Sequence, residues 1–405
     1  MSDAVGLLSV DFLPVITGFE SISSLPEYES FPVLVERANY YLRNNPLVTV
    51  NTCESVEFRV TNRGCDIQTR NSVYIAPVES STRYARGLRL WIQRKVCHST
   101  SYDQIGYDNF LPDIYGQKIS EGLESVMAKI NHRYRHTPLK GRIITVETQP
   151  VKWGSRGLDP DRTIWKEHAF ASTLYVNVIR IFYIIGTVKP CQVGVHDIVP
   201  AVLESGGLFS RPKMESFQPV IQRASQWLMS LPPNCRPVNV QTVMFRWSNN
   251  QGINTNNLVY QENNTRQNCL RYLRVGFVME NPTDGPPARS LIQLHCKLIV
   301  PRMTFAFGCR STGEFETQES TRNRVNAWVR ATGARVVCVE SLFMRTYSDG
   351  TPEYGFDDMR PYDAVTSGPK SSTRAEERFV HLYRIYTDGH YPDPPSAPTW
   401  QTLML

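Results

Sequence analysis

Glu54-Ser55-Val56-Glu57-Phe58-Arg59 is the stretch that decides the fold, because close copies of it return at three later places in the chain. Each copy has Glu or Gln, then Ser or Thr, two variable residues, an apolar residue, and Arg or Lys. The copies follow one another at intervals of roughly 95 residues, and self-similarity at a fixed period is typical of a repeat architecture. The other copies are Glu147-Thr148-Gln149-Pro150-Val151-Lys152, Gln241-Thr242-Val243-Met244-Phe245-Arg246 and Glu340-Ser341-Leu342-Phe343-Met344-Arg345.

Two further landmarks keep the same order around each copy. An apolar pair followed by proline precedes it, and an arginine between two apolar residues follows it. Three landmarks that recur in one order indicate internal duplication more strongly than any single short match. The prolines are Pro14, Pro112, Pro200 and Pro301, and the arginines are Arg89, Arg180, Arg274 and Arg384.

The segments between these landmarks predict one helix and three strands in each section. Apolar residues at i, i+4, i+7 and i+8, as in Leu34, Ala38, Tyr41 and Leu42, indicate a helix with one buried face. Runs rich in Val, Ile and Thr then predict strands at 48–60, 143–152, 238–247 and 336–346. After a long polar loop, the arginine segments predict last strands at 87–95, 178–185, 272–279 and 380–387.

The sequence therefore predicts an α+β protein of four tandem β-α-β-β repeats of about 95 residues. Each repeat is a helix packed on a small, mainly antiparallel sheet. We expect the repeats to associate in pseudo-symmetric pairs or in a row of four, because pairing covers open sheet edges. The expected division is 1–105, 106–194, 195–294 and 295–390 for the repeats, and 391–405 for a Pro-rich tail.

Composition excludes several classes of protein. Of the 405 residues, 41% are hydrophobic and 20% are charged, which is typical of a globular chain. The net charge of +6 is spread along the chain with no basic block, which argues against a nucleic-acid binder. No signal peptide and no apolar run of membrane-spanning length is present, so we expect no membrane insertion. Nine cysteines without a Cys-x-x-Cys pair predict free thiols and a cytoplasmic location.

The repeated polar positions are the first candidate site. If the two long strands pair antiparallel, the acidic or amide residue and the arginine face each other across the ladder. We interpret them as structural pins, because a folding device is needed in every repeat and an active site is not. The alternative is one ligand pocket per repeat, with the arginine holding an anionic group. The residues are Glu54, Arg89, Glu147, Arg180, Gln241, Arg274, Glu340 and Arg384.

Aromatic residues in the inter-strand loops are the second candidate. They either cap the core between helix and sheet, which we prefer, or form one wall of a ligand pocket. These residues are Tyr74, Trp165, Tyr260 and Tyr354.

No catalytic motif is present, so the sequence predicts no catalytic residue, no cofactor and no metal. His132 and His136 lie at i and i+4 on the second helix, but no third ligand is apparent and basic neighbours surround them. The acidic loop between Asp349 and Asp363 lacks the spacing of an EF-hand and is interpreted as a solvated loop.

These observations favour a non-enzymatic, multivalent binding or scaffold protein whose loops differ between similar cores. A protein partner or self-association is the expected interaction. The first alternative is a structural subunit of a larger cytoplasmic or viral assembly, built through exposed sheet edges. The second is an enzyme or small-ligand binder that keeps a pocket in one pair of repeats.

Overall fold

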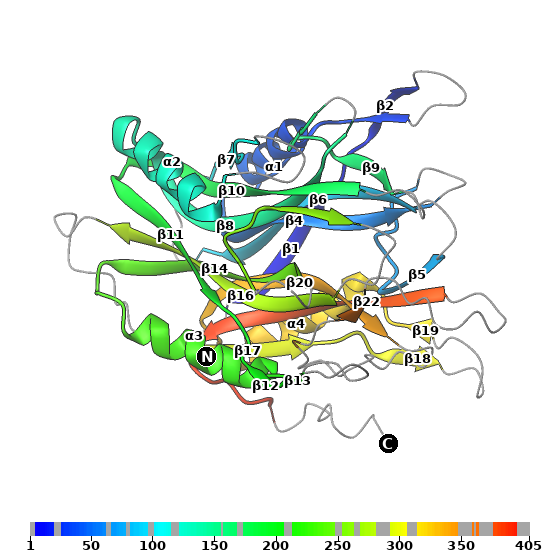
Figure 1. The fold of residues 1–405 in the computed structure, drawn as a ribbon. Helices are drawn as coiled ribbons and strands as arrows, with labels where there is room; N and C mark the ends of the chain where they lie inside the picture. The colour runs from blue at the N-terminus through cyan, green and yellow to red at the C-terminus, as the bar shows by residue number, and fades with distance from the viewer. Residues whose placement is uncertain are drawn as a thin grey trace.

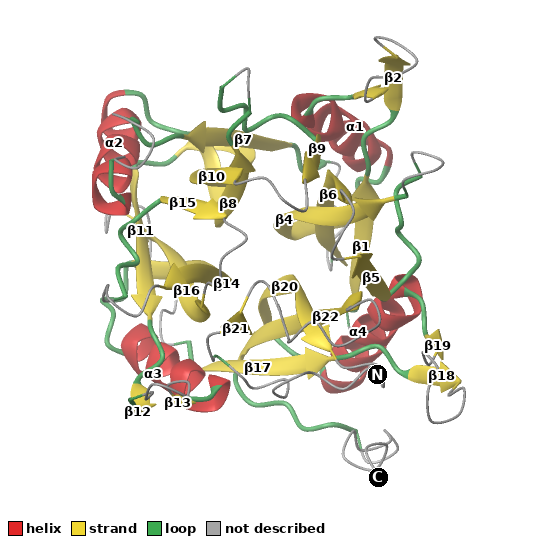
Figure 2. Ribbon diagram, turned by 45° about the vertical axis from the view of Figure 1, so that its right-hand side comes forward, coloured by secondary structure: helices red, strands yellow, loops and turns green. Residues whose placement is uncertain are grey.

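The computed structural model shows an α+β protein in which small, mainly antiparallel sheets form four blades around a common centre (Figure 2). Within the described residues there are four helices, one at each corner of the ring: α1 (Phe31–Asn44), α2 (Leu123–His136), α3 (Phe217–Met229) and α4 (Gln318–Thr332). The structure describes residues 5–19, 26–61, 66–77, 82–95, 101–114, 121–154, 157–167, 173–205, 213–247, 253–262, 268–280, 292–305, 314–346, 359, 362–363 and 376–394.

Every blade has the same strand order. The first strand of a section lies at the outer edge, the last strand is central, and the middle strand lies at the inner edge. Blade 1 contains β1 (Leu7–Phe12), β6 (Thr82–Arg94) and β4 (Val48–Val60), and blade 2 contains β7 (Ile105–Phe110), β10 (Thr173–Val188) and β8 (Lys140–Lys152). Blade 3 contains β11 (Cys191–Ile198), β16 (Asn268–Glu280) and β14 (Cys235–Trp247), and blade 4 contains β17 (Leu294–Ile299), β22 (Glu376–Asp388) and β20 (Val336–Thr346).

The fourth strand of each sheet comes from another section of the chain, which the expected β-α-β-β unit did not include. Each is a short strand in the loop between the two long strands, and it pairs with the central strand of the preceding blade. β5 of the first section pairs with β22 of the last, so the exchange closes a circle (Figure 1). The exchanged strands are β9 (Ile164–Glu167) on blade 1, β15 (Val259–Glu262) on blade 2, β21 (Tyr362–Asp363) on blade 3 and β5 (Val73–Pro77) on blade 4.

The hydrophobic core is divided among the four junctions, and a helix fills each one. α1 packs on Leu88 and Leu90 of blade 1 and also on Phe182 of blade 2. α4 in the same way packs between Ile385 of blade 4 and Trp91 of blade 1. Each helix thus buries its apolar stripe against two blades, because one face of a small sheet cannot enclose a core alone. α2 and α3 fill the two remaining junctions.

The closed ring differs from the pairs or open row that we expected. Inner strands contact each other around the full circle, β4 with β8, β8 with β14, β14 with β20 and β20 with β4. Because every core cluster draws residues from two neighbouring sections, the division of the chain into separate units stays a prediction.

The expected long strands are present, and the central strands begin earlier than predicted. β6, for example, begins at Thr82 rather than at 87, because its first residues pair with β9. Short hairpins also join the outer strand to the helix in three sections: β2 (Ile16–Phe19) with β3 (Pro26–Tyr28), β12 (Val202–Glu204) with β13 (Lys213–Met214), and β18 (Met303–Phe305) with β19 (Glu314–Phe315).

Candidate functional site

The repeated acidic and arginine positions are cross-strand partners in every blade. The antiparallel register places Glu54 opposite Arg89, Glu147 opposite Arg180, Gln241 opposite Arg274 and Glu340 opposite Arg384. The predicted arrangement across the ladder is therefore present. Both members nevertheless also form hydrogen bonds to the neighbouring blade.

The acidic side chain of each blade bonds to the backbone of the preceding one. Glu147 of blade 2 accepts from the Ser55 N–H of blade 1 at 3.1 Å and from the Ser55 hydroxyl. Glu340 of blade 4 accepts from the Thr242 N–H and, at 2.9 Å, from its hydroxyl. Each acid thus satisfies a backbone donor that its neighbour's inner-edge strand would otherwise leave unpaired.

Gln241 makes the same junction without a charge. Its Oε1 accepts from the Thr148 N–H at 2.8 Å, and its Nε2 donates to the Thr148 carbonyl oxygen at 3.0 Å. An amide offers both a donor and an acceptor, so it bonds to both backbone groups of one residue.

Each arginine reaches the hydroxyl of the same preceding blade. Arg89 Nη1 donates to Ser341 Oγ at 2.8 Å, and Arg180 Nη1 donates to Ser55 Oγ at 2.8 Å. The hydroxyl position that recurs in the sequence is therefore held between an arginine and an acid or amide of the next blade. The other two bonds join Arg274 to Thr148 at 2.8 Å and Arg384 to Thr242 at 2.7 Å.

The arginines are fully buried, so their remaining donors need partners inside the protein. Arg89 makes a bidentate pair with Asp11 at 2.6 and 2.8 Å, and Arg274 makes one with Asp197 at 2.7 Å for both bonds. Arg180 instead donates to the uncharged Asn109 at 2.8 Å. Arg180 and Arg384 also lie over the rings of Phe31 and Phe217, at 3.9 and 3.8 Å from the ring centres.

Burial controls the ionisation of this network. Burial raises the pKa of the Glu147 and Glu340 carboxyls, although the arginine opposite each one opposes the shift. Burial also raises the pKa of Glu54, to about 7, against the effects of Arg89 and of hydrogen bonds from Trp91 and Ser341. The pKa of Arg180 falls to about 10 because desolvation exceeds the attraction of Glu147.

A cavity of about 120 Å³ lies where the four inner strands meet, and all four acidic or amide positions line it. Gln149 also lines it and is buried. The cavity is smaller than the usual range for organic ligands, which starts near about 300 Å³. In the same described part, no group of three or more His, Cys, Asp or Glu residues is placed to hold a metal ion.

The loop aromatics do not line this cavity. Tyr74, Trp165 and Tyr260 lie on the exchanged strands and stack on aromatic side chains of the preceding blade, with centroids 5.1, 5.7 and 5.3 Å apart. They anchor the exchanged strands, which neither of our interpretations included. Tyr354 lies outside the described residues. The register position that matches the other three is Tyr362, opposite Cys269, as Tyr74 is opposite Phe379.

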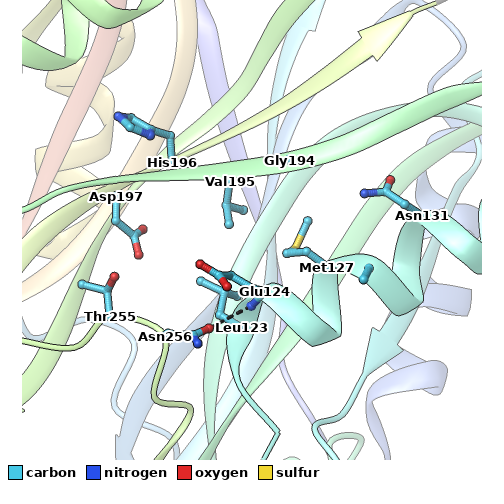
Figure 3. A pocket seen from close by; sticks show the side chains of 11 residues that line it. Leu123, Glu124, Met127, Asn131, Gly194, Val195, His196, Asp197, Thr255 and Asn256 are labelled. Carbon is cyan, nitrogen blue, oxygen red and sulfur yellow. Dashed lines mark hydrogen bonds between the residues drawn. The ribbon is translucent and has the colours of Figure 1, made fainter.

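A larger groove, of about 440 Å³, opens between α2 and β11 at the junction of blades 2 and 3 (Figure 3). Asn256 Oδ1 accepts from the Glu124 N–H at 2.9 Å on one wall, and Asp197 is engaged by Arg274 on the other. His196 stacks on Trp227 at 4.1 Å, and burial lowers the pKa of its imidazole. The His196 side chain points away from the groove, toward Trp227 of α3, whereas the Glu124 side chain faces it (Figure 3).

The remaining candidates from the sequence gain little from the structure. The rings of His132 and His136 lie 4.4 Å apart on α2. Most of the acidic loop lies outside the described residues, with Asp363 placed only by its backbone pairing to Asn268. None of the described helices combines the length and the apolar character needed to cross a bilayer.

Sequence reasoning missed the outer-strand partners of the arginines, although a signal was present. Asp11, Asn109 and Asp197 each stand three residues before the landmark proline, and Leu298 takes that position in the last section. No family model, curated protein or solved structure matches this chain.

Proposed function

We propose that this chain is a non-enzymatic scaffold that binds a macromolecular partner through several loops at one rim of a closed ring. The observation that carries the proposal is the common direction of the four inner strands. It concerns the loops that follow β4, β8, β14 and β20, at 61–72, 153–163, 248–258 and 347–361.

The direction follows from hydrogen bonds at two levels of each junction. Cys53 and Ser55 bond to Thr145 and Glu147, so two steps along β4 correspond to two steps along β8. Two further junctions repeat this spacing: Val146 and Thr148 bond to Asn239 and Gln241, and Val240 and Thr242 bond to Cys338 and Glu340. At the last, Asn51 and Glu54 bond to Val336 and Ser341. Strands that run the same way deliver their following loops to the same end of the ring.

The ring of inner strands beneath these loops is a frame that is cross-linked by hydrogen bonds at every junction. Three of these loops also cap a helix of the preceding blade: the Asp161 carbonyl accepts from the Phe31 N–H, the Asn256 carbonyl from the Leu123 N–H, and the Arg70 carbonyl from the Gln318 N–H. A frame that is cross-linked in this way supports several weak sites at fixed spacing, and such sites add to high avidity.

We further propose that the ring arose from four tandem copies of a β-α-β-β segment of about 95 residues. The support is that acid, hydroxyl and arginine recur in sequence and also make equivalent contacts at each junction. We also propose a cytoplasmic location, since Cys53, Cys191, Cys235, Cys296 and Cys338 are free thiols.

The experiment replaces rim loops with Gly/Ser segments of equal length, one at a time and in pairs. Binding is measured by quantitative cross-linking and mass spectrometry in an extract of the native source. We expect each replacement to weaken capture of the same partner and pairs to weaken it multiplicatively. The control replaces the helix-to-strand turn at 231–234, at the opposite rim, and leaves binding unchanged. Equal losses for both rims, or no specific partner at all, would refute the proposal.

A specific observation also favours the assembly alternative. In the described part of the chain, the outer strands β1 and β17 pair over their whole length on one side only, with β6 and β22. Outer edges of this kind accept a strand from another molecule. Multi-angle light scattering separates the two ideas, because a strictly monomeric protein at micromolar concentration removes the assembly function.

The groove of Figure 3 is the observation that favours the small-ligand alternative. It belongs to one junction and to one pair of sections, as that alternative requires. Substitution of Glu124 by Ala tests it, because ligand binding would be weakened while scaffold binding at the rim stays intact.

A further inference from the structure

The number of carboxylates beside each buried arginine differs between the blades. In every sheet the arginine on the central strand has one neighbour on the inner strand and one on the outer strand. A buried guanidinium requires a compensating negative charge nearby, since an unpaired buried ion is strongly destabilising. The two flanking positions therefore show how each blade supplies that charge.

In blades 2 and 4, the inner strand supplies the negative charge that compensates the arginine. Arg180 has Glu147 on its inner side and the neutral Asn109 on its outer side. Arg384 has Glu340 on its inner side and Leu298 on its outer side. Asp161 adds a more distant carboxylate, 3.8 Å from Arg180 and about one third exposed.

In blade 3, the outer strand supplies the negative charge that compensates the arginine. Arg274 makes its bidentate pair with Asp197, and the inner position holds Gln241, which carries no charge. In these three blades, one flanking position is acidic and the other is neutral.

Blade 1 is the exception, because both flanking positions are acidic. Asp11 accepts hydrogen bonds from Nε and Nη2 of Arg89, and Nη1 of Arg89 donates to the Ser341 hydroxyl. Glu54 therefore receives no hydrogen bond from Arg89. It accepts from the Trp91 indole N–H and from the Ser341 N–H at 2.8 Å, and a hydrogen bond from the Ser341 hydroxyl also opposes the rise of its pKa. Asp11 also lies 3.5 Å from Arg322, and Glu54 is the second carboxylate beside Arg89, the one that the Arg89 guanidinium does not hydrogen-bond.

We propose that Glu54 is a proton-binding site of the closed ring that loses its proton as the pH rises through neutrality, which makes the junction of blades 1 and 4 the pH-sensitive one. A protonated carboxyl keeps acceptor capacity for Trp91 and Ser341 and removes a buried negative charge that Arg89 does not hydrogen-bond. Burial with only partial compensation by Arg89 raises the pKa of Glu54 to about 7, which agrees with the geometry.

The surroundings of Glu54 contain several ionisable groups. Glu147 from β8 and Glu340 from β20 line the same cavity, and each has its own arginine opposite. Their presence disfavours a further negative charge at Glu54. The other titratable groups around this junction are Cys53, Cys338, Asp11, Arg89, Arg322, His381 and Tyr383.

The sign of the pH dependence follows from linkage. Above pH 4.5 the unfolded chain has released this proton, whereas the folded ring keeps it until about pH 7. The folded state thus binds more protons over this interval, so its stability falls as pH rises. The unfolding equilibrium constant then increases by up to about tenfold per pH unit, and the dependence ends above the folded pKa.

Two substitutions convert blade 1 into arrangements that the chain already uses. Glu54→Gln reproduces the acid and amide of blade 3, and Asp11→Asn reproduces the amide and acid of blade 2. Glu54→Gln leaves the Trp91 donor without an acceptor and lowers stability at every pH. The test therefore compares how the free energy of unfolding changes with pH and does not compare its absolute value. Glu340→Gln is the matched control, because it removes a carboxylate whose arginine has no second acid at its flanking positions.

The experiment measures urea unfolding of the full chain between pH 5 and 8.5, together with carbon NMR titration of the glutamate carboxyls. We expect Glu54→Gln to flatten the slope between pH 5 and 7 and to remove one carboxyl resonance that titrates near pH 7. We expect Asp11→Asn to lower the pKa of Glu54, because the positive charge of Arg89 is then no longer shared with the Asp11 carboxylate. Glu340→Gln should leave the resonance near neutrality in place. A Glu54 resonance that titrates below pH 5 in the unsubstituted protein, or equal slopes with and without Glu54, would overturn the proposal.

Discussion

Arg89 and Ser341 are 252 positions apart in the chain, and Arg89 Nη1 donates to Ser341 Oγ at 2.8 Å. This bond joins the first blade to the last. Glu54 reinforces it from the same blade by accepting from the Ser341 N–H at 2.8 Å. The contact is equivalent to those between consecutive blades, so the ring closes with the same interaction that builds it.

Removal of a central-strand arginine should destabilise the whole ring. We expect Arg89→Ala, Arg180→Ala and Arg384→Ala each to lower the free energy of unfolding by about 3–5 kcal/mol, because a buried carboxylate or hydroxyl loses its partner. Urea unfolding followed by circular dichroism measures the change. Arg94→Ala is the control at an exposed position on β6 and should change stability by less than about 0.5 kcal/mol. Comparable effects at Arg94 and Arg89 would show that the buried arginines are not structural pins.

The hydroxyl that each arginine reaches should matter through its oxygen and not through its volume. Thr148→Val keeps the shape but leaves Arg274 Nη1 without an acceptor, at a cost of about 1–3 kcal/mol. Thr148→Ser keeps the oxygen and should cost clearly less. Thermal unfolding of both variants provides the comparison. If Ser were as destabilising as Val, packing of the methyl group would explain the position instead.

Introduction of a second carboxylate into blade 3 should create a new pH dependence. Gln241→Glu places an acid beside an arginine that Asp197 already pairs, so burial should raise the pKa of the new group above its ordinary value. The folded state then holds a proton that the unfolded state releases, and stability falls as pH rises. Melting temperatures at pH 5 and pH 8 test this, with Gln241→Asn as a neutral control. A variant that is more stable at pH 8 than at pH 5, relative to the control, would contradict the charge compensation that we describe.

The exchanged strands should depend on their stacked aromatics. Trp165 is buried, stacks on Tyr84, and lies 4.9 Å from the Arg86 guanidinium. We expect Trp165→Ala to cost about 3–5 kcal/mol and Trp165→Phe to retain a large part of the stability. Hydrogen exchange at the Arg86 amide reports whether β9 has left blade 1, since this N–H donates to the Thr163 carbonyl oxygen, next to β9, at 2.6 Å. Unchanged protection in the Ala variant would mean that backbone pairing alone holds the strand.

Much of the fold within a blade could be predicted from local pattern. The recurring acid and arginine positions predicted that Glu54 and Arg89 face each other if the two long strands pair antiparallel, and this register is present. The helix stripe at Leu34, Ala38 and Leu42 is likewise buried. Period-2 and period-3.6 patterns record which side chains share a face, and this information is local to each element.

Equivalent aromatic positions in the loops between the two long strands could not be predicted from local pattern. We assigned Tyr354 by its place in a loop, whereas the strand position is that of Tyr362. Loop lengths differ between sections, so counting along the chain does not find equivalent positions in loops. Only the pairing of an exchanged strand with a central strand identifies them.

The sequence by itself determined which residues recur and which faces are apolar, and it predicted that each acid or amide faces an arginine if the two long strands pair antiparallel. Only the tertiary structure decided that these groups bond to the preceding blade, that Asp11 takes the arginine from Glu54, and that the first and last blades meet. The physical reason is that a strand's alternation records its own two faces but not its lateral neighbours. Those neighbours were selected by burial of each helix between two sheets and by the need to satisfy every buried charge and backbone donor.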